Sequence, residues 1–148
     1  MSFLDRFIAY AADFEQTYLD DDWSRLERYF TEDAVYEVKN VPFACRLEGR
    51  AAVLRGIRKS LDGFDRKFAV RRVEVTGAPE ILPDGVAVPW KGTYEGEALE
   101  PVTIRGRSQA RYLGDRIVYL SDTYEDGIGE RTMAWARKHG GEFDPSYV

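Results

Sequence analysis

One aspartate near the end of the chain stands among apolar residues, and it is the first candidate for chemistry. In the segment 116–125, Asp122 alternates in step with Val118, Leu120 and Tyr124, so a strand places all four on one face. A carboxylate among apolar neighbours loses hydration, which raises its pKa and suits it to exchange protons near neutral pH. The alternative is that the opposite face points inward, which leaves Asp122 solvated or paired with an arginine of the sheet.

Aromatic side chains share the faces that we expect to point inward. They are candidates to line a pocket for a small apolar or aromatic ligand, and small neighbours such as Gly106 leave part of that space unfilled. The alternative is that they only fill the core. The predicted lining consists of Tyr36, Trp90, Tyr94, Ser108, Tyr112, Leu120 and Tyr124.

Other kinds of site find little support in the sequence. Cys45 is the only cysteine and His139 the only histidine, so an intrachain disulfide and a thiolate metal cluster are excluded. The sequence contains no glycine-rich phosphate loop, no cluster of metal ligands and no nucleophile elbow. We therefore expect neither a cofactor nor a metal.

Length and charge limit the class of protein. The 148 residues fit one domain, 1–148, that buries a single core. The net charge is −5 and no segment clusters Lys and Arg with exposed aromatics, so we expect no nucleic-acid partner. The longest apolar run, 7–12, is far shorter than a membrane span, and the N-terminus lacks the pattern of a signal peptide. We expect a soluble, cytoplasmic protein that does not bind membranes.

The elements that must position these residues follow from hydrophobic periodicity. Helices are predicted at 2–19, 23–30 and 49–61, and a short one at 130–139 that stops at Gly140-Gly141; strands are predicted at 34–39, 66–76, 85–95, 103–113 and 116–125. Pro89 cannot donate a ladder hydrogen bond, which suggests an edge strand or a bulge. This order predicts an α+β fold, a curved antiparallel sheet packed against three N-terminal helices.

Two motifs make the chain similar to a known superfamily. The first is the junction Tyr29 to Tyr36, which ends Glu-Asp-Ala-Val-Tyr, and the second is the Leu-Glu-Gly-Arg-Ala-Ala-Val segment 47–53. Together with the order of elements, they resemble the nuclear-transport-factor-2-like superfamily, which includes ketosteroid isomerases, limonene epoxide hydrolases and SnoaL-like polyketide cyclases. The resemblance implies a cone-shaped, cystatin-like fold that encloses a blind pocket.

The resemblance also implies roles for individual residues. Asp122 matches the acid-base aspartate that SnoaL-like cyclases and epoxide hydrolases keep on the last strand. Tyr36 matches a pocket tyrosine of the epoxide hydrolases, so the predicted catalytic residues are Asp122 and Tyr36. Phe14 and Val38 stand where ketosteroid isomerases have a tyrosine and an aspartate, so these two are predicted to line the pocket, without that chemistry. Where the epoxide hydrolases need an arginine and a second aspartate, the chain has Lys91 and Thr93, and their machinery is therefore incomplete.

Two functions stay open. One is a cofactor-independent enzyme, a cyclase, isomerase, dehydratase or hydrolase that uses general acid-base catalysis on a small apolar or aromatic substrate. The other is a non-catalytic module of the same fold that binds a small ligand or a protein. We also expect a homodimer, paired through the outer sheet face, as superfamily members commonly are. That face is predicted to carry Arg105, Arg107, Gln109, Arg111, Ile117, Tyr119, Ser121 and Thr123.

Overall fold

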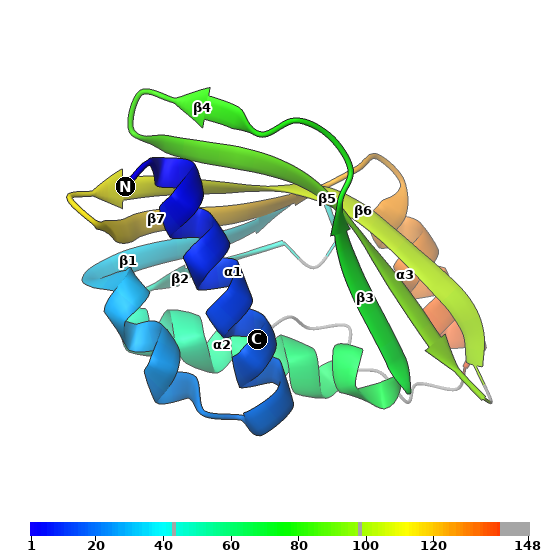
Figure 1. Cartoon of the computed structure of the whole chain (residues 1–148). Coiled ribbons are helices and arrows are strands. Elements are labelled where there is room, and N and C mark those ends of the chain that lie inside the picture. The colour runs from blue at the N-terminus through cyan, green and yellow to red at the C-terminus, as the bar shows by residue number, and fades with distance from the viewer. Residues whose placement is uncertain (43, 98, 140–148) are drawn as a thin grey trace.

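The computed structural model describes residues 1–42, 44–97 and 99–139 (Figure 1). The helical elements are α1 (Phe3–Asp20), the 3₁₀ helix η1 (Trp23–Tyr29), α2 (Arg50–Gly63), the short 3₁₀ turn η2 (Asp65–Lys67) and α3 (Ile128–Lys138). The strands are β1 (Phe30–Lys39), β2 (Cys45–Glu48), β3 (Val70–Val75), β4 (Glu80–Leu82), β5 (Gly85–Gly96), β6 (Leu99–Leu113) and β7 (Arg116–Tyr124). The predicted stop of the last helix, Gly140-Gly141, lies outside the described residues.

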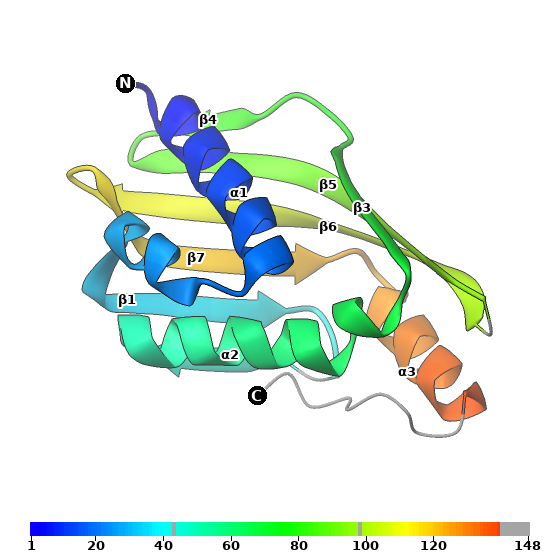
Figure 2. The same cartoon turned by 60° about the horizontal axis from the view of Figure 1, so that its bottom comes forward.

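The strands form one curved sheet in the order β2-β1-β7-β6-β5-β3, with β4 paired to β5. Helices α1 and α2 cover its inner face, and α3 lies beside the far ends of the strands (Figures 1 and 2). The predicted α+β class and the short C-terminal helix are therefore confirmed. The sheet is mixed rather than wholly antiparallel, because β1 and β7 run parallel. Parallel pairing needs a long connection, and the whole segment between these two strands provides it.

Two short strands were missing from the prediction. The segments β2 and β4 have only four and three residues, which is too short to show an alternating pattern. The second predicted helix is a 3₁₀ helix, and the first residues of the strand predicted at 66–76 instead form η2. The third predicted helix is the α-helix α2.

The position of Pro89 explains how a proline fits in an inner strand. Strand β5 lies between β6 and β3, so the edge position, one of the two predicted alternatives, is wrong. The pairing of β5 with β6 also runs through Pro89 without a bulge. On the outer side of β5, β3 pairs as far as Trp90 and β4 begins at Ala87, so Pro89 lies opposite the break between them. Its carbonyl accepts a hydrogen bond from the Thr76 amide at 3.1 Å. The missing N–H of the proline therefore breaks no ladder.

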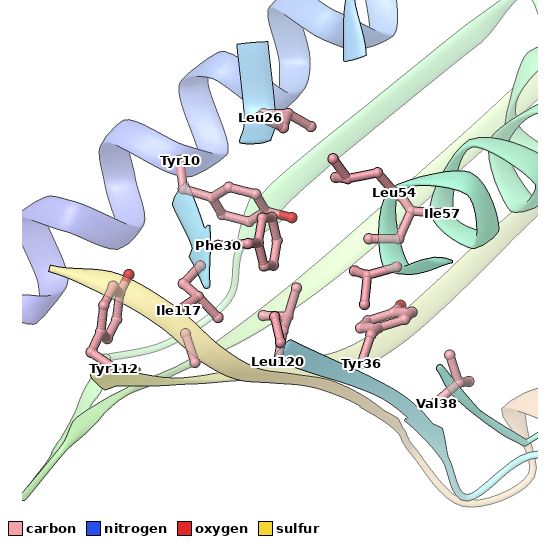
Figure 3. Close-up of a cluster of buried hydrophobic side chains, with 13 residues drawn as sticks. Tyr10, Leu26, Phe30, Tyr36, Val38, Leu54, Ile57, Tyr112, Ile117 and Leu120 are labelled. Carbon is pink, nitrogen blue, oxygen red and sulfur yellow. The ribbon is translucent and has the colours of Figure 1, made fainter. Parts of the chain in front are cut away.

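The main core lies between the sheet and the two long helices. Leu54 and Ile57 of α2 and Tyr10 of α1 approach the side chains that rise from the sheet, among them Tyr36 and Leu120 (Figure 3). Helix α1 begins with a capping box, in which Ser2 accepts from the Asp5 amide and the Asp5 carboxylate accepts from Ser2. A second cluster under α3 contains Phe68, Tyr94, Val102, Ile104 and Ile128.

A bulge changes which residues of β7 face the core. Arg111 pairs with Tyr119, but the next residue, Tyr112, pairs with Ile117, so Val118 is the extra residue of β7. Ile117 was expected on the outer face, and it is instead fully buried in the main core. The bulge reverses the alternation on one side of Val118, and the sequence pattern contains no sign of this reversal.

In the described part of the chain, no helix is both long and apolar enough to cross a bilayer.

Candidate functional site

The sheet register places the candidate residues in one row. Asp122 on β7 is directly opposite Ser108 on β6, and Ser108 is opposite Val88 on β5. Tyr36 and Trp90 lie one diagonal step away on the flanking strands, β1 and β5. Because side chains two residues apart share a face, these residues all point toward the helices.

The Asp122 carboxylate is held from two sides. The Tyr36 hydroxyl lies 2.5 Å from Oδ2, and the Ser108 hydroxyl donates to Oδ1. The Trp90 indole donates from Nε1 to the Ser108 Oγ at 2.9 Å. These hydrogen bonds form a network of side chains from four strands. It runs from Trp90 through Ser108 to Asp122 and on to Tyr36.

The indole of Trp90 determines the direction of donation in this hydrogen-bond network. An indole N–H can only donate, so Ser108 accepts from Trp90 and its own proton must point elsewhere. That proton goes to Oδ1 of Asp122, which therefore acts as an acceptor. Oδ2 accepts from the Tyr36 hydroxyl, which can turn from donor to acceptor, so a proton bound by Asp122 is accommodated at Oδ2.

Burial raises the pKa of Asp122 above its ordinary value of 3.8 because the charged form loses hydration. The hydrogen bonds from Ser108 and Tyr36 act in the opposite direction, and burial has the larger effect. Within the described ranges, the hydrogen-bond donors to Asp122 are the neutral hydroxyls of Ser108 and Tyr36. The pKa of the carboxyl group is thus raised by burial and moderated by two neutral donors.

Asp122 faces a cavity of about 400 Å³ between the sheet, α1 and the edge strand β3. The size suits a small organic ligand. Its walls are mainly apolar and aromatic, and they also include a few charged groups. The lining residues are Phe7, Tyr10, Ala11, Ala12, Phe14, Glu15, Tyr36, Ile57, Ser60, Leu61, Asp65, Arg71, Val73, Glu74, Val75, Val88, Trp90, Tyr94, Ser108, Leu120, Asp122 and Tyr124.

Most of the predicted site residues lie at this cavity. Both predicted catalytic residues, Asp122 and Tyr36, line it, and so do six of the residues predicted to bind substrate: Phe14, Trp90, Tyr94, Ser108, Leu120 and Tyr124. Tyr124 meets Trp90 edge to face, with ring centroids 5.8 Å apart. The catalytic role of Asp122 and Tyr36 stays a prediction.

Two predicted lining residues, Val38 and Tyr112, lie elsewhere. Val38 is 1% exposed and packs within the main core, farther along β1 than Tyr36 (Figure 3). Tyr112 lies beyond the bulge and stacks on Phe3 of α1, with centroids 5.2 Å apart. Burial raises the pKa of Tyr112 to about 12. Both predictions followed the strand alternation correctly, but the first turn of α1 covers Tyr112 and the core closes over Val38.

A second polar group at the cavity was missed. Arg71 of β3 donates from Nε to Asp65 Oδ2 at 2.8 Å and from a terminal nitrogen to Glu15 of α1 at 2.7 Å. Asp65 also accepts from the Tyr94 hydroxyl at 3.2 Å. The available signal was that Arg71 alternates in step with Val73 and Val75, which marks an arginine on an inward face. Asp65 gave no such signal, because it lies in an irregular turn.

In the ranges that the structure describes, no three His, Cys, Asp or Glu side chains come together in a way that could hold a metal ion.

Sequence comparison identifies the family. Residues 9–120 match the model of the SnoaL-like domain, which is most of the chain. The chain belongs to the SnoaL-like domain family. The match ends two residues before Asp122, so it does not include this aspartate. No curated protein shows significant sequence similarity to the chain.

Solved structures agree with this SnoaL-like assignment at the level of the fold. A cystatin-like protein of unknown function from Xanthomonas campestris is 18% identical, with a TM-score of 0.64 over 91% of this chain and 98% of that one. A Jannaschia protein, provisionally assigned as a SnoaL-like polyketide cyclase, is 12% identical, with a TM-score of 0.64 over 89% and 92%. TerC, co-crystallised with polyporic acid, is 12% identical, with a TM-score of 0.63 over 91% and 95%.

Proposed function

We propose that this SnoaL-like protein is a cofactor-independent enzyme that moves a proton on a small apolar or aromatic substrate. The observation that carries the proposal is the Asp122 carboxyl, which is desolvated, faces the cavity and is held by Tyr36 and Ser108. Cyclisation, isomerisation, dehydration and hydrolysis can all use such a group as general acid or base.

The hydrogen bonds assign a task to each residue. As a base, Asp122 takes a proton from a substrate C–H or O–H bond, and the bonding electron pair stays on the substrate. The proton binds at Oδ2, because Oδ1 accepts from Ser108. Tyr36 lies beside this oxygen and keeps the carboxyl in place while it changes charge. As an acid, Asp122 later returns the proton to a carbon or oxygen atom of the product.

The comparisons support the class of function. The fold is shared with a provisionally assigned polyketide cyclase and with TerC, which holds polyporic acid in its crystal. A small ligand in the cavity of this chain is consistent with both. The homodimer and the cytoplasmic location expected from the sequence stay predictions.

The test begins with a ligand screen by thermal shift. A binder present at about a hundred times its Kd adds about 2.7 kcal/mol to the free energy of unfolding, which is easily measured. Each binder is then incubated with the protein in D₂O, and NMR follows both deuterium uptake at its carbon atoms and conversion to product. Deuterium enters the carbon atom when the proton held by Asp122 exchanges with solvent before it is returned, and conversion to product reports direct return.

Asp122→Asn is the decisive variant. It keeps the shape of the side chain and removes the proton exchange, so the rate is expected to fall by about 10²–10⁴ while affinity changes little. The matched control is Asp115→Asn, at an exposed turn between β6 and β7. Binders that neither exchange nor react, or a rate that survives Asp122→Asn, favour the alternative, a non-catalytic binding module.

A further inference from the structure

Arg71 forms a rigid cationic centre in the wall of the cavity. Its side chain is only 7% exposed, and Asp65, itself 14% exposed, accepts from its Nε. The guanidinium lies over the ring of Tyr18, 4.6 Å from the centroid, and 5.9 Å from that of Phe14. A guanidinium that is stacked and held at Nε presents its terminal nitrogens in a fixed direction.

Those terminal nitrogens already hold a carboxylate. Glu15 of α1 accepts from Nη1 at 2.7 Å, and its own side chain is 52% exposed. Both Glu15 and Arg71 line the cavity. Because the Glu15 carboxylate is half exposed, it can turn into solvent while Asp65 stays paired with Arg71. The exchange of one carboxylate for another leaves the charge around the guanidinium unchanged.

The two polar centres lie apart along the same wall. Arg71 pairs with Tyr94 on β5, whereas Ser108, the partner of Asp122, pairs with Val88, six positions earlier on that strand. The register places Trp90 and Tyr124, which both line the cavity, between these two levels. A ligand that reaches both centres is elongated, apolar in the middle and polar at each end.

We propose that Arg71 is the binding site for a carboxylate of the ligand, and that Glu15 occupies this position until the ligand displaces it. The substrate class is therefore an apolar or aromatic carboxylic acid whose far end reaches Asp122. Arg71 presents a planar fork of N–H donors that matches a carboxylate. The identity of the reacting end rests on the proposed function, whereas the carboxylate site does not.

Three fluorescent probes that differ only in their terminal group test the proposal: pyrenebutyric acid, pyrenebutanol and pyrenebutylamine. At pH 7, the acid is expected to bind about tenfold or more tightly than the alcohol, because a hydrogen bond to a charged group is stronger than one between neutral groups. Weaker or equal binding of the acid, an absence of acid binding, or a preference for the amine would overturn the proposal.

Glu15→Gln is the informative variant because the Glu15 side chain is 52% exposed and Asp65 stays paired with Arg71, so the fold is expected to stay intact. It removes the competing carboxylate, so the affinity for the acid is expected to rise several-fold while that for the alcohol stays the same. Glu74→Gln is the matched control. Glu74 also lines the cavity, but it pairs with Lys91 rather than with Arg71. If Glu15→Gln and Glu74→Gln raise the affinity for the acid equally, the loss of one negative charge explains the result. The assignment of Arg71 as the carboxylate site would then be overturned.

Two further variants separate this site from the proposed function. Arg71→Lys keeps the positive charge but loses the planar pair of N–H donors. The affinity for the acid is therefore expected to fall toward the affinity for the alcohol. Asp122→Asn is expected to keep the preference for the acid unchanged. If the protein prefers the acid but turns over no substrate, the carboxylate site stands and the enzyme proposal fails. If it turns over a substrate but does not prefer the acid, the enzyme proposal stands and the carboxylate site fails.

Discussion

At Asp122, burial and hydrogen bonding act on one carboxyl group in opposite directions. Loss of hydration favours the protonated form, while the donors Ser108 and Tyr36 favour the carboxylate. The pKa of Asp122 is raised overall, and each of the two donors lowers it separately. Substitution of one donor is therefore expected to change the pKa of the carboxyl group without removing the group itself.

Tyr36→Phe removes one donor and retains the aromatic ring. The pKa of Asp122 is expected to rise further, so the rising limb of a base-catalysed pH–rate profile moves to higher pH. The profile of kcat/KM against pH on a substrate found in the screen measures this shift. Tyr119→Phe is the control, because its hydroxyl donates to Glu37 at 3.0 Å on the other side of the sheet. An unchanged profile for Tyr36→Phe would exclude Asp122 as the titrating base.

The raised pKa of Asp122 also predicts how stability depends on pH. Between the ordinary value near 3.8 and the raised value in the folded state, the folded chain holds a proton that the unfolded chain has lost. The contribution of Asp122 to stability is therefore fully present below pH 3.8 and is lost as the pH rises through the folded pKa.

Asp122→Asn removes this loss, since the amide does not ionise. The free energy of unfolding of the variant, relative to the parent, is expected to increase with pH across that window and then to level off. Urea unfolding at a series of pH values measures the difference. A difference that stays constant with pH would show that the folded and unfolded chains bind the proton equally.

At the scale of elements, β5, β6 and β7 position the site, and Gly106 makes their geometry possible. Gly106 is paired with both Trp90 and Tyr124, so it lies between the two rings. A Cβ at this position would come within 2.9 Å of both the Thr123 carbonyl oxygen and the Trp90 ring. The absence of a side chain lets Trp90 lie flat enough to reach Ser108.

Gly106→Ala is therefore expected to destabilise the fold by about 1–3 kcal/mol, since the backbone carbonyl cannot move away cheaply. It also displaces the Trp90 ring from Ser108, which changes the near-ultraviolet circular dichroism and the tryptophan fluorescence. Gly77→Ala is the control, because the nearest atom to its Cβ is a proline carbon 3.4 Å away. Equal stabilities of the two variants would contradict the tight fit at Gly106.

The edge strand β3 gives the cavity its opening. Val73 and Val75 line the cavity, yet they are 44% and 63% exposed. Strand β3 is the last strand of the sheet on this side. Glu15 and Arg71 therefore lie near the entrance, whereas Asp122 lies deeper, on an inner strand.

At the scale of the whole molecule, the outer sheet face is the surface proposed for dimerisation. Arg107 pairs with Glu80 and Arg111 with Asp84, both from the segment around β4, and Tyr119 donates to Glu37. With these charges neutralised, the face offers a surface that a two-fold partner could cover.

Light scattering coupled to size exclusion is expected to give twice the 17.0 kDa mass of the chain at micromolar concentration. High salt is expected to weaken the dimer only slightly, because Arg107 and Arg111 are paired within one chain. A mass equal to that of one chain would contradict the dimer.

Local pattern was enough to predict much of this protein. Alternation along 116–125 placed Asp122 on an apolar face, and hydrophobic periodicity located the first helix, because both depend only on neighbours in the chain. The order of elements, with the Tyr29 to Tyr36 junction, predicted the α+β class and the superfamily. These features are properties of short segments, and the sequence determines them directly.

The tertiary structure decided what depends on distant partners. The bulge at Val118 turned Ile117 into the core, and α1 covered Tyr112, although neither effect has a local signal. Arg71 gained its role only when a turn brought Asp65 to its Nε and α1 brought Glu15 to its terminal nitrogens. Register across separate strands and the meeting of charges far apart in the chain are set by packing, and hydrophobic periodicity carries no record of either.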